Sequence, residues 1–138
     1  MKKTLLALTF ALGTVAAHAA DKDRIPVAFD CTHANDDFVG IRLCTALRDR
    51  IAKSPRYYEV SENDATHFGI HLVSLSVSEA LSAQAVSVTV TAKTLHFYLD
   101  TQAYTTGSDK VATQADAILA AMDDDVTEFT KAWNDDKK

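Results

Sequence analysis

The chain has 138 residues, with 14 Lys and Arg against 19 Asp and Glu, and it contains two cysteines. This length fits one domain that can bury a core of its own without help from a metal ion. The acidic balance argues against nucleic acid and anionic membrane as partners, because both are bound through basic patches.

Residues 1–19 have the pattern of a secretory signal peptide. Lys2 and Lys3 give a positive start, Leu5 to Val15 is an apolar core too short for a stable membrane span, and Ala17-His18-Ala19 fits the cleavage pattern. Cleavage would leave one domain, residues 20–138, with 12 basic and 19 acidic residues and a net charge of −7. We therefore expect a soluble periplasmic or secreted protein, with no membrane insertion and no lipid anchor.

A strand, a helix and a second strand are predicted between Arg24 and Val60. Ile25, Val27 and Phe29 alternate with smaller or polar residues, which indicates a strand with one buried face. Pro26 cannot donate to a neighbouring strand, so this strand should have an unpaired side near its start. The helix should begin at the polar run 35–37, end at Ser54-Pro55, and be followed by the strand 57–60. Short turns between these elements favour a parallel crossover.

The predicted helix carries one apolar stripe and one of the two cysteines. Leu43, Leu47 and Ile51 recur every four residues and should face the sheet, with Cys44 beside them. In an exported chain, Cys31 and Cys44 most simply form a disulfide that joins the end of the first strand to the inner side of this helix. The alternative is two separate buried thiols. The spacing is not the Cys-x-x-Cys of a redox enzyme.

Two further β segments follow the crossover. In the strand 67–77 the alternation changes phase near Leu72, which predicts a bulge or a strand covered partly on both faces. The stretch from Ala85 to Thr106 alternates strictly and predicts a hairpin with a turn at Lys93-Thr94 or a longer loop in the same register. That register pairs Val90 with Phe97 and Val88 with Leu99 on the inner face, and it pairs Thr91 with His96 and Thr89 with Tyr98 on the outer face.

The predicted outer sheet face is the candidate binding surface. It would display polar residues and two tyrosines, which suit protein contacts because Tyr offers both apolar area and a polar tip. The alternative is an ordinary hydrated sheet face. If these tyrosines prove buried, the helix surfaces or the strand edge near Pro26 become the candidates. The predicted binding residues are Thr89, Thr91, His96, Tyr98, Asp100, Gln102 and Tyr104.

A long amphipathic helix closes the chain. Ser108 is the expected N-cap, and apolar residues from Val111 to Trp133 then step by three and four positions, across the acidic run Asp123 to Asp125. The order of elements is therefore β-α-β-β-β-β-α. We predict an α+β domain with a mixed β-sheet of four to five strands and both helices packed on one face.

This order of elements resembles the TolB amino-terminal domain and the related domain of CsgG-type secretion proteins and of outer-membrane activators of peptidoglycan synthases. The resemblance lies in the strand Ile25 to Phe29, in Phe38-Val39-Gly40 at the helix start, and in the segment Ser54 to Val60. We expect neither the TolB propeller nor its lipid anchor in this protein, and the cysteine pair is an addition to the TolB pattern. The resemblance implies a domain that binds partner proteins in the cell envelope and is not an enzyme.

The sequence therefore predicts an exported binding or adaptor protein that contacts an envelope or extracellular protein. We expect no enzymatic activity, no cofactor and no metal. The alternative is a small exported hydrolase or metal-binding protein that uses His71 and His96, with a carboxylate such as Asp100. A nuclease using His96 with Lys93 is opposed by the acidic charge. The run Asp123 to Asp125 lacks the spacing of a calcium-binding loop.

Overall fold

The computed structural model describes residues 24–64, 66–77, 83–93 and 97–136. The predicted signal peptide, residues 1–19, lies outside the described residues, as does His96. The element order is the predicted one. The elements are β1 (Ile25–Thr32), α2 (Phe38–Lys53), β2 (Tyr57–Glu59), β3 (Phe68–Ser76), β4 (Ala83–Ala92), β5 (Phe97–Gly107) and α3 (Val111–Asp135).

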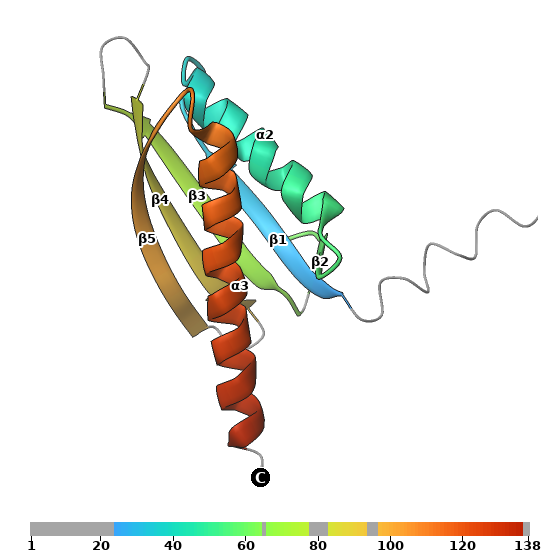
Figure 1. The fold of residues 1–138 in the computed structure, drawn as a ribbon. Helices are drawn as coiled ribbons and strands as arrows, with labels where there is room; N and C mark the ends of the chain where they lie inside the picture. The colour runs from blue at the N-terminus through green and yellow to red at the C-terminus, as the bar shows by residue number, and fades with distance from the viewer. Residues whose placement is uncertain (1–23, 65, 78–82, 94–96, 137–138) are drawn as a thin grey trace, which may run out of the picture.

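One mixed sheet of five strands, in the order β2-β1-β3-β4-β5, forms one layer of the structure. β1 runs parallel to both β2 and β3, whereas β4 and β5 are antiparallel to their neighbours. Both helices lie against the same face of the sheet (Figure 1). The predicted α+β class, the parallel crossover and the placement of both helices are confirmed.

The first helix begins and ends where its sequence predicts. The side chain of Asp37 accepts a hydrogen bond of 2.6 Å from the Gly40 amide and so caps α2, and Ser54 follows its last turn. The predicted Cys31–Cys44 disulfide is present, with 6.2 Å between the two Cα atoms. Pro26 precedes the β1–β3 pairing, which starts at Val27. At Ile25 and Pro26, β1 pairs with β2 and not with β3. The side of β1 that faces β3 is therefore the unpaired side predicted near its start.

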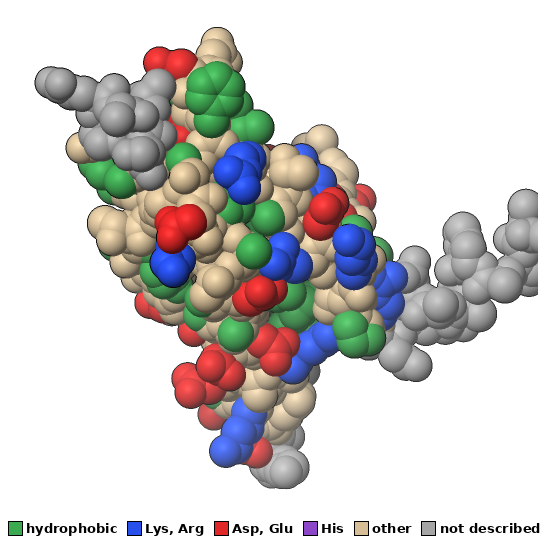
Figure 2. Space-filling model, turned by 45° about the horizontal axis from the view of Figure 1, so that its top comes forward, with side chains coloured by type: hydrophobic (Ala, Val, Ile, Leu, Met, Phe, Trp, Pro, Cys, Tyr) green, Lys and Arg blue, Asp and Glu red, His purple; other side chains and the backbone are tan. Residues whose placement is uncertain are grey.

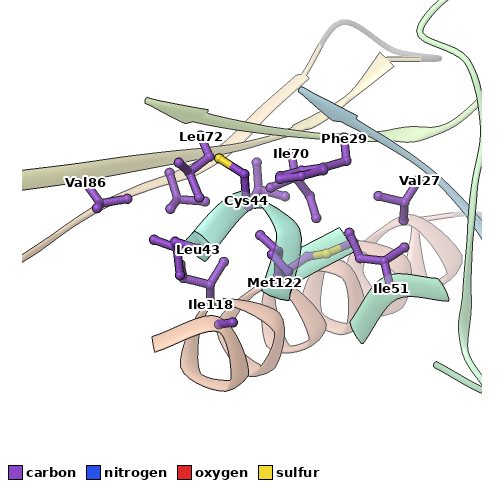
Figure 3. Close-up of a cluster of buried hydrophobic side chains, with 14 of the residues drawn as sticks. Val27, Phe29, Leu43, Cys44, Ile51, Ile70, Leu72, Val86, Ile118 and Met122 are labelled. Carbon is purple, nitrogen blue, oxygen red and sulfur yellow. The ribbon is translucent and has the colours of Figure 1, made fainter. Parts of the chain in front are cut away.

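The core lies between the sheet and the two helices (Figure 3). Leu43, Leu47 and Ile51 of α2 are fully buried, which confirms the predicted stripe. Ile118 and Met122 of α3 meet the same cluster. Burying each of these aliphatic side chains stabilises the fold by roughly 1.5–3 kcal/mol relative to exposure.

Ion pairs join α2 to its neighbouring elements. Arg50 of α2 binds Asp116 of α3, and Arg48 of α2 binds Glu59 of β2 at 3.1 Å. On the side turned to the viewer in Figure 2, basic and acidic side chains are interspersed. This side therefore presents no single-sign field that would steer a charged partner. In the described residues, neither helix is long and apolar enough to cross a membrane.

The bulge predicted near Leu72 as one of two alternatives for the third strand is wrong. Ile70, Leu72 and Ser74 of β3 stay on the buried face without interruption, and the β3–β4 register continues past Leu72 without a bulge. Val73 and Leu75 lie on the opposite face, and Leu75 is 63% exposed. The pattern misled because apolar residues occupy both faces of this strand, although only one face packs on the helices.

The predicted register of the β4–β5 hairpin is also wrong. Val90 pairs with Asp100 and not with Phe97, a displacement of three residues. The pairing nearest the turn joins Ala92 to Phe97, and Leu99 is an extra residue between the pairs Thr91–Tyr98 and Val90–Asp100. Because side chains alternate along a strand, an odd displacement moves every residue beyond Leu99 to the other face.

The last helix is continuous across Asp123 to Asp125 but begins later than predicted. Its N-cap is Lys110, without a side-chain cap, and not Ser108. Asp123 is tied to the edge strand β2, since its carboxylate accepts hydrogen bonds from Tyr57 Oη at 2.5 Å and from Arg56 at 3.0 Å. Burial and the contact with Asp123 raise the pKa of Tyr57.

Candidate functional site

Three strands finish in register at one end of the sheet. Phe68 of β3 pairs with Ala92 of β4, which pairs with Phe97 of β5. Directly paired residues share a face, and Ala92 is buried beneath the helices, so both phenylalanines lie on the helix face. The last turns of α3 extend past this end of the sheet (Figure 1). The sheet therefore stops before the apolar stripe of α3 does.

Four aromatic rings gather at this place, and we call them the aromatic end: Phe68, Phe97, Phe129 and Trp133. The Phe129 ring lies 5.9 Å from that of Phe68 and 6.1 Å from that of Phe97, and it stacks on Trp133 at 6.4 Å between centroids. Phe97 is 51% exposed and Trp133 is 40% exposed. The ring contacts position Phe97 and Trp133, and both of these rings present a large part of their surface to solvent.

An apolar hollow of about 240 Å³ opens within the aromatic end. Pro26 contributes to its wall, together with Phe68, Phe129 and Trp133. The strand edge near Pro26 was one of the alternative binding regions expected from the sequence. Concave apolar sites with few polar groups are the usual form of a binding pocket.

A second, more polar hollow of about 390 Å³ lies beside the first, toward the outer face of the sheet. Glu62, His71, Lys93 and Tyr98 line it. His67 belongs to both hollows and is 5% exposed; its Nδ1 donates to the Asp64 carbonyl oxygen at 2.9 Å. This buried histidine therefore contributes to the walls of both hollows.

The predicted outer-face residues are divided between the two faces of the sheet. Thr89, Thr91 and Tyr98 do lie on the outer face, where Thr89 Oγ1 is 2.9 Å from Thr101 Oγ1 and Tyr98 is 61% exposed. His96 lies outside the described residues. A single surface of all the predicted residues is therefore not formed.

Asp100, Gln102 and Tyr104 lie on the helix face, because they pair with the buried valines of β4. Gln102 Nε2 donates to Asp100 at 2.8 Å, and Tyr104 Oη donates to Gln102. Burial, and then the charges of Asp100 and Asp125, raise the pKa of Tyr104. The outer-face prediction for these three residues is wrong, since the displaced register turned them toward α3.

The suggested grouping of His71 with Asp100 is wrong for the same reason. His71 pairs with Thr89 on the outer face, whereas Asp100 is on the helix face. The structure instead brings Asp30 and Glu62 to His71. Asp30 is the register partner of His71 in the neighbouring parallel strand, and Glu62 comes from the turn after β2. Sequence alternation places Asp30 opposite to Phe29, but it does not indicate which residue lies beside it.

No protein-family model matches this chain, and no curated protein matches it. Among solved structures, TolB from Acinetobacter baumannii superimposes on 76% of the chain with a TM-score of 0.59. The fold resembles part of TolB. The identity is 9%, and the chain spans 29% of the length of that protein. At this identity the likeness supports the expected TolB-like architecture and says nothing about shared residues.

Proposed function

We propose that this protein is an exported binding protein that contacts another protein of the cell envelope or extracellular space through the aromatic end. The single observation that carries the proposal is the cluster of four rings, three of which line an apolar hollow, with Phe97 51% exposed and Trp133 40% exposed. Contiguous exposed apolar surface of this kind is typical of interaction sites. Aromatic side chains also dominate the energetics of protein interfaces.

The rings of the aromatic end are suited to anchor a partner because little conformational entropy would be lost on binding. Phe129 is held between Phe68, Phe97 and Trp133 before any partner arrives. Removing apolar surface from water contributes about 25 cal/mol per Å². A preformed apolar surface retains more of that free energy than a mobile surface. We propose a binding role and not a catalytic role on this basis.

The compartment is supported by two independent features. The Cys31–Cys44 disulfide is typical of proteins that fold in an oxidising environment. The segment 1–19 has the charge, apolar core and small residues of a secretory signal. The TolB-like architecture is compatible with a protein of the envelope, but it does not name the partner.

Site-specific photo-crosslinking tests the proposal. A photoreactive amino acid is placed at position 97 or 133 in the aromatic end, and at position 75 as a control. Leu75 is also exposed and apolar, but it pairs with Ala85 toward the far end of the same strands. We expect positions 97 and 133 to crosslink the same protein in the envelope fraction, and excess wild-type protein to compete. Crosslinking to that protein only from position 75 would overturn the proposal.

A further inference from the structure

The outer face of the sheet carries a group of three potential metal ligands outside the aromatic end. Asp30 of β1 and His71 of β3 are register partners in adjacent parallel strands, and Glu62 reaches them from the turn that follows β2. One ligand atom from each residue lies within 4.8 Å of the other two. All three side chains are between 42% and 58% exposed, so an ion can reach them from solvent.

The distances fit a single small cation between the three groups. His71 Nδ1 lies 4.0 Å from Asp30 Oδ2 and 3.9 Å from Glu62 Oε1, and both separations are too long for hydrogen bonds. Two ligand atoms on a tetrahedral zinc ion lie roughly 3.4 Å apart, given metal–ligand bonds near 2.1 Å. The separations from His71 Nδ1 exceed that spacing by about 0.5–0.6 Å, and the ligand atoms of Asp30 and Glu62 lie within 4.8 Å of each other, so side-chain rotations of the order of 1 Å would let the three groups share one ion.

The imidazole is oriented toward the carboxylates by a glycine beneath it. A Cβ atom at Gly69 would lie 2.9 Å from His71 Nε2 and 2.5 Å from Thr91 Oγ1. The absence of a side chain at Gly69 therefore leaves the space that the ring occupies, with Nδ1 facing Asp30 and Glu62. Residues that fix the orientation of a ligating histidine contribute to metal affinity.

The turn that carries Glu62 is held by its own hydrogen bonds. The Ser61 amide donates to Asp64 Oδ2 at 3.0 Å, and the Asp64 amide donates to the Ser61 carbonyl at 3.0 Å. The Asn63 amide also donates to Ser61 Oγ at 3.3 Å. Two ligands thus stand on central strands of the sheet, and the third stands on a fixed turn, which lowers the entropy lost on binding.

We propose that Asp30, Glu62 and His71 bind a divalent transition-metal ion of the zinc class. One imidazole nitrogen and two carboxylate oxygens favour zinc, cobalt or nickel over magnesium or calcium, which take all-oxygen ligand sets. Three protein ligands leave a fourth position open on a tetrahedral ion. Glu62 and His71 also line the polar hollow, so that position is accessible from it. The ion would neutralise two carboxylates that otherwise face each other.

The test is a zinc titration of the oxidised protein, purified without a histidine tag, by calorimetry and by competition with a chromophoric indicator. We expect saturation at one zinc per chain and a higher melting temperature with zinc, because ligand binding stabilises the folded state. His71→Ala should weaken zinc binding by at least about tenfold, and Asp30→Asn and Glu62→Gln should each weaken it severalfold. Magnesium should not compete.

His33→Ala is the matched control, since His33 is a partly exposed histidine outside the group of three, and its Nδ1 contacts the Ala34 carbonyl at 3.1 Å. It should bind zinc as the wild type does, and so should Trp133→Ala, which alters only the aromatic end. Circular dichroism of the metal-free variants separates lost ligands from lost folding; Asp30→Asn preserves the shape of an exposed side chain. Absence of zinc binding by the wild type, or equal binding by the Asp30, Glu62 and His71 variants, would overturn the proposal.

Discussion

Ser74 Oγ of β3 donates a hydrogen bond of 2.7 Å to Asp37 Oδ2, the residue that caps α2. Both residues are buried, and the other carboxylate oxygen of Asp37 accepts from the Gly40 amide. The Asp37 carboxylate therefore accepts hydrogen bonds both from an amide in the first turn of α2 and from a hydroxyl of strand β3. This contact fixes α2 along its own axis, and α2 in turn places Cys44 beside Cys31.

Asp37→Ala should lower the free energy of unfolding by about 2–4 kcal/mol. The loss combines about 1 kcal/mol for the N-cap with about 1–3 kcal/mol for a buried Ser74 hydroxyl left without its partner. Urea unfolding measures the change. Asp36→Ala, an exposed neighbour in the same turn, is the control and should cost less than about 0.5 kcal/mol. Equal, small losses in both variants would contradict this role for Asp37.

Gly40→Ala should destabilise the protein through the same contact. A Cβ atom at Gly40 would lie 2.2 Å from Asp37 Oδ2 and 2.7 Å from Ser74 Oγ. These side chains would have to shift to make room, which would weaken their buried hydrogen bond. In an ordinary helix interior, alanine in place of glycine would instead stabilise by roughly 0.5–1 kcal/mol. The sign of the change in unfolding free energy is therefore the informative result, and a stabilised Gly40→Ala variant would show that the Asp37 contact is absent.

Asp125→Asn should stabilise the protein near neutral pH. Asp125 Oδ2 is buried without a hydrogen-bond partner among the described residues, and burial, then the charge of Asp100, raise the pKa of the carboxyl. A raised pKa means that the folded state binds the proton more tightly than the unfolded state does. The contribution of Asp125 to stability is therefore full below the unfolded pKa and is lost as pH rises through the folded pKa.

The comparison of wild type and Asp125→Asn should accordingly be made by thermal unfolding across a pH series. We expect the advantage of the variant near neutral pH to shrink as pH falls below about 3, where the wild-type carboxyl is mostly protonated in both states. An advantage that stayed constant across the series would mean that the charge of Asp125 is not its cause.

Protein purified from the envelope should be processed and oxidised. Its intact mass should match a chain that starts at Ala20 and has lost two hydrogen atoms, because Cys31 and Cys44 are joined. Replacing both cysteines by serine should cost about 3 kcal/mol in the chain-entropy account of a loop of this size. A full-length, reduced protein recovered from the cytoplasm would contradict the proposed export.

Local patterns predicted the helices well because the residues that decide them are close in sequence. The stripe Leu43, Leu47 and Ile51 has its own period, and Asp37 and Ser54 bound the helix on either side. Truncating Leu47 or Ile118 to Ala should cost about 2–5 kcal/mol, as both are fully buried. A loss below about 0.5 kcal/mol at both positions would mean that the helices pack differently.

The candidate sites were harder to predict because they depend on pairings between distant strands. The pairing of Ala92 with Phe97 and one extra residue, Leu99, turned Asp100 and Tyr104 toward the helices. The parallel register that sets Asp30 beside His71 leaves no local pattern in either strand. The spacing of Trp133 predicts one more buried position on the apolar stripe of α3. It is partly exposed because the helix extends past the end of the sheet.

The most direct test of the aromatic end as a binding site is the affinity of this protein for the partner that is crosslinked from positions 97 and 133. Its dissociation constant is measured for the wild type, Phe97→Ala, Trp133→Ala and the control Leu75→Ala. We predict that each aromatic variant weakens binding by about tenfold or more, while Leu75→Ala binds as the wild type does, because interface energy concentrates in central aromatic anchors. Unchanged affinity in both aromatic variants, with weaker binding by Leu75→Ala, would contradict the aromatic end as the binding site.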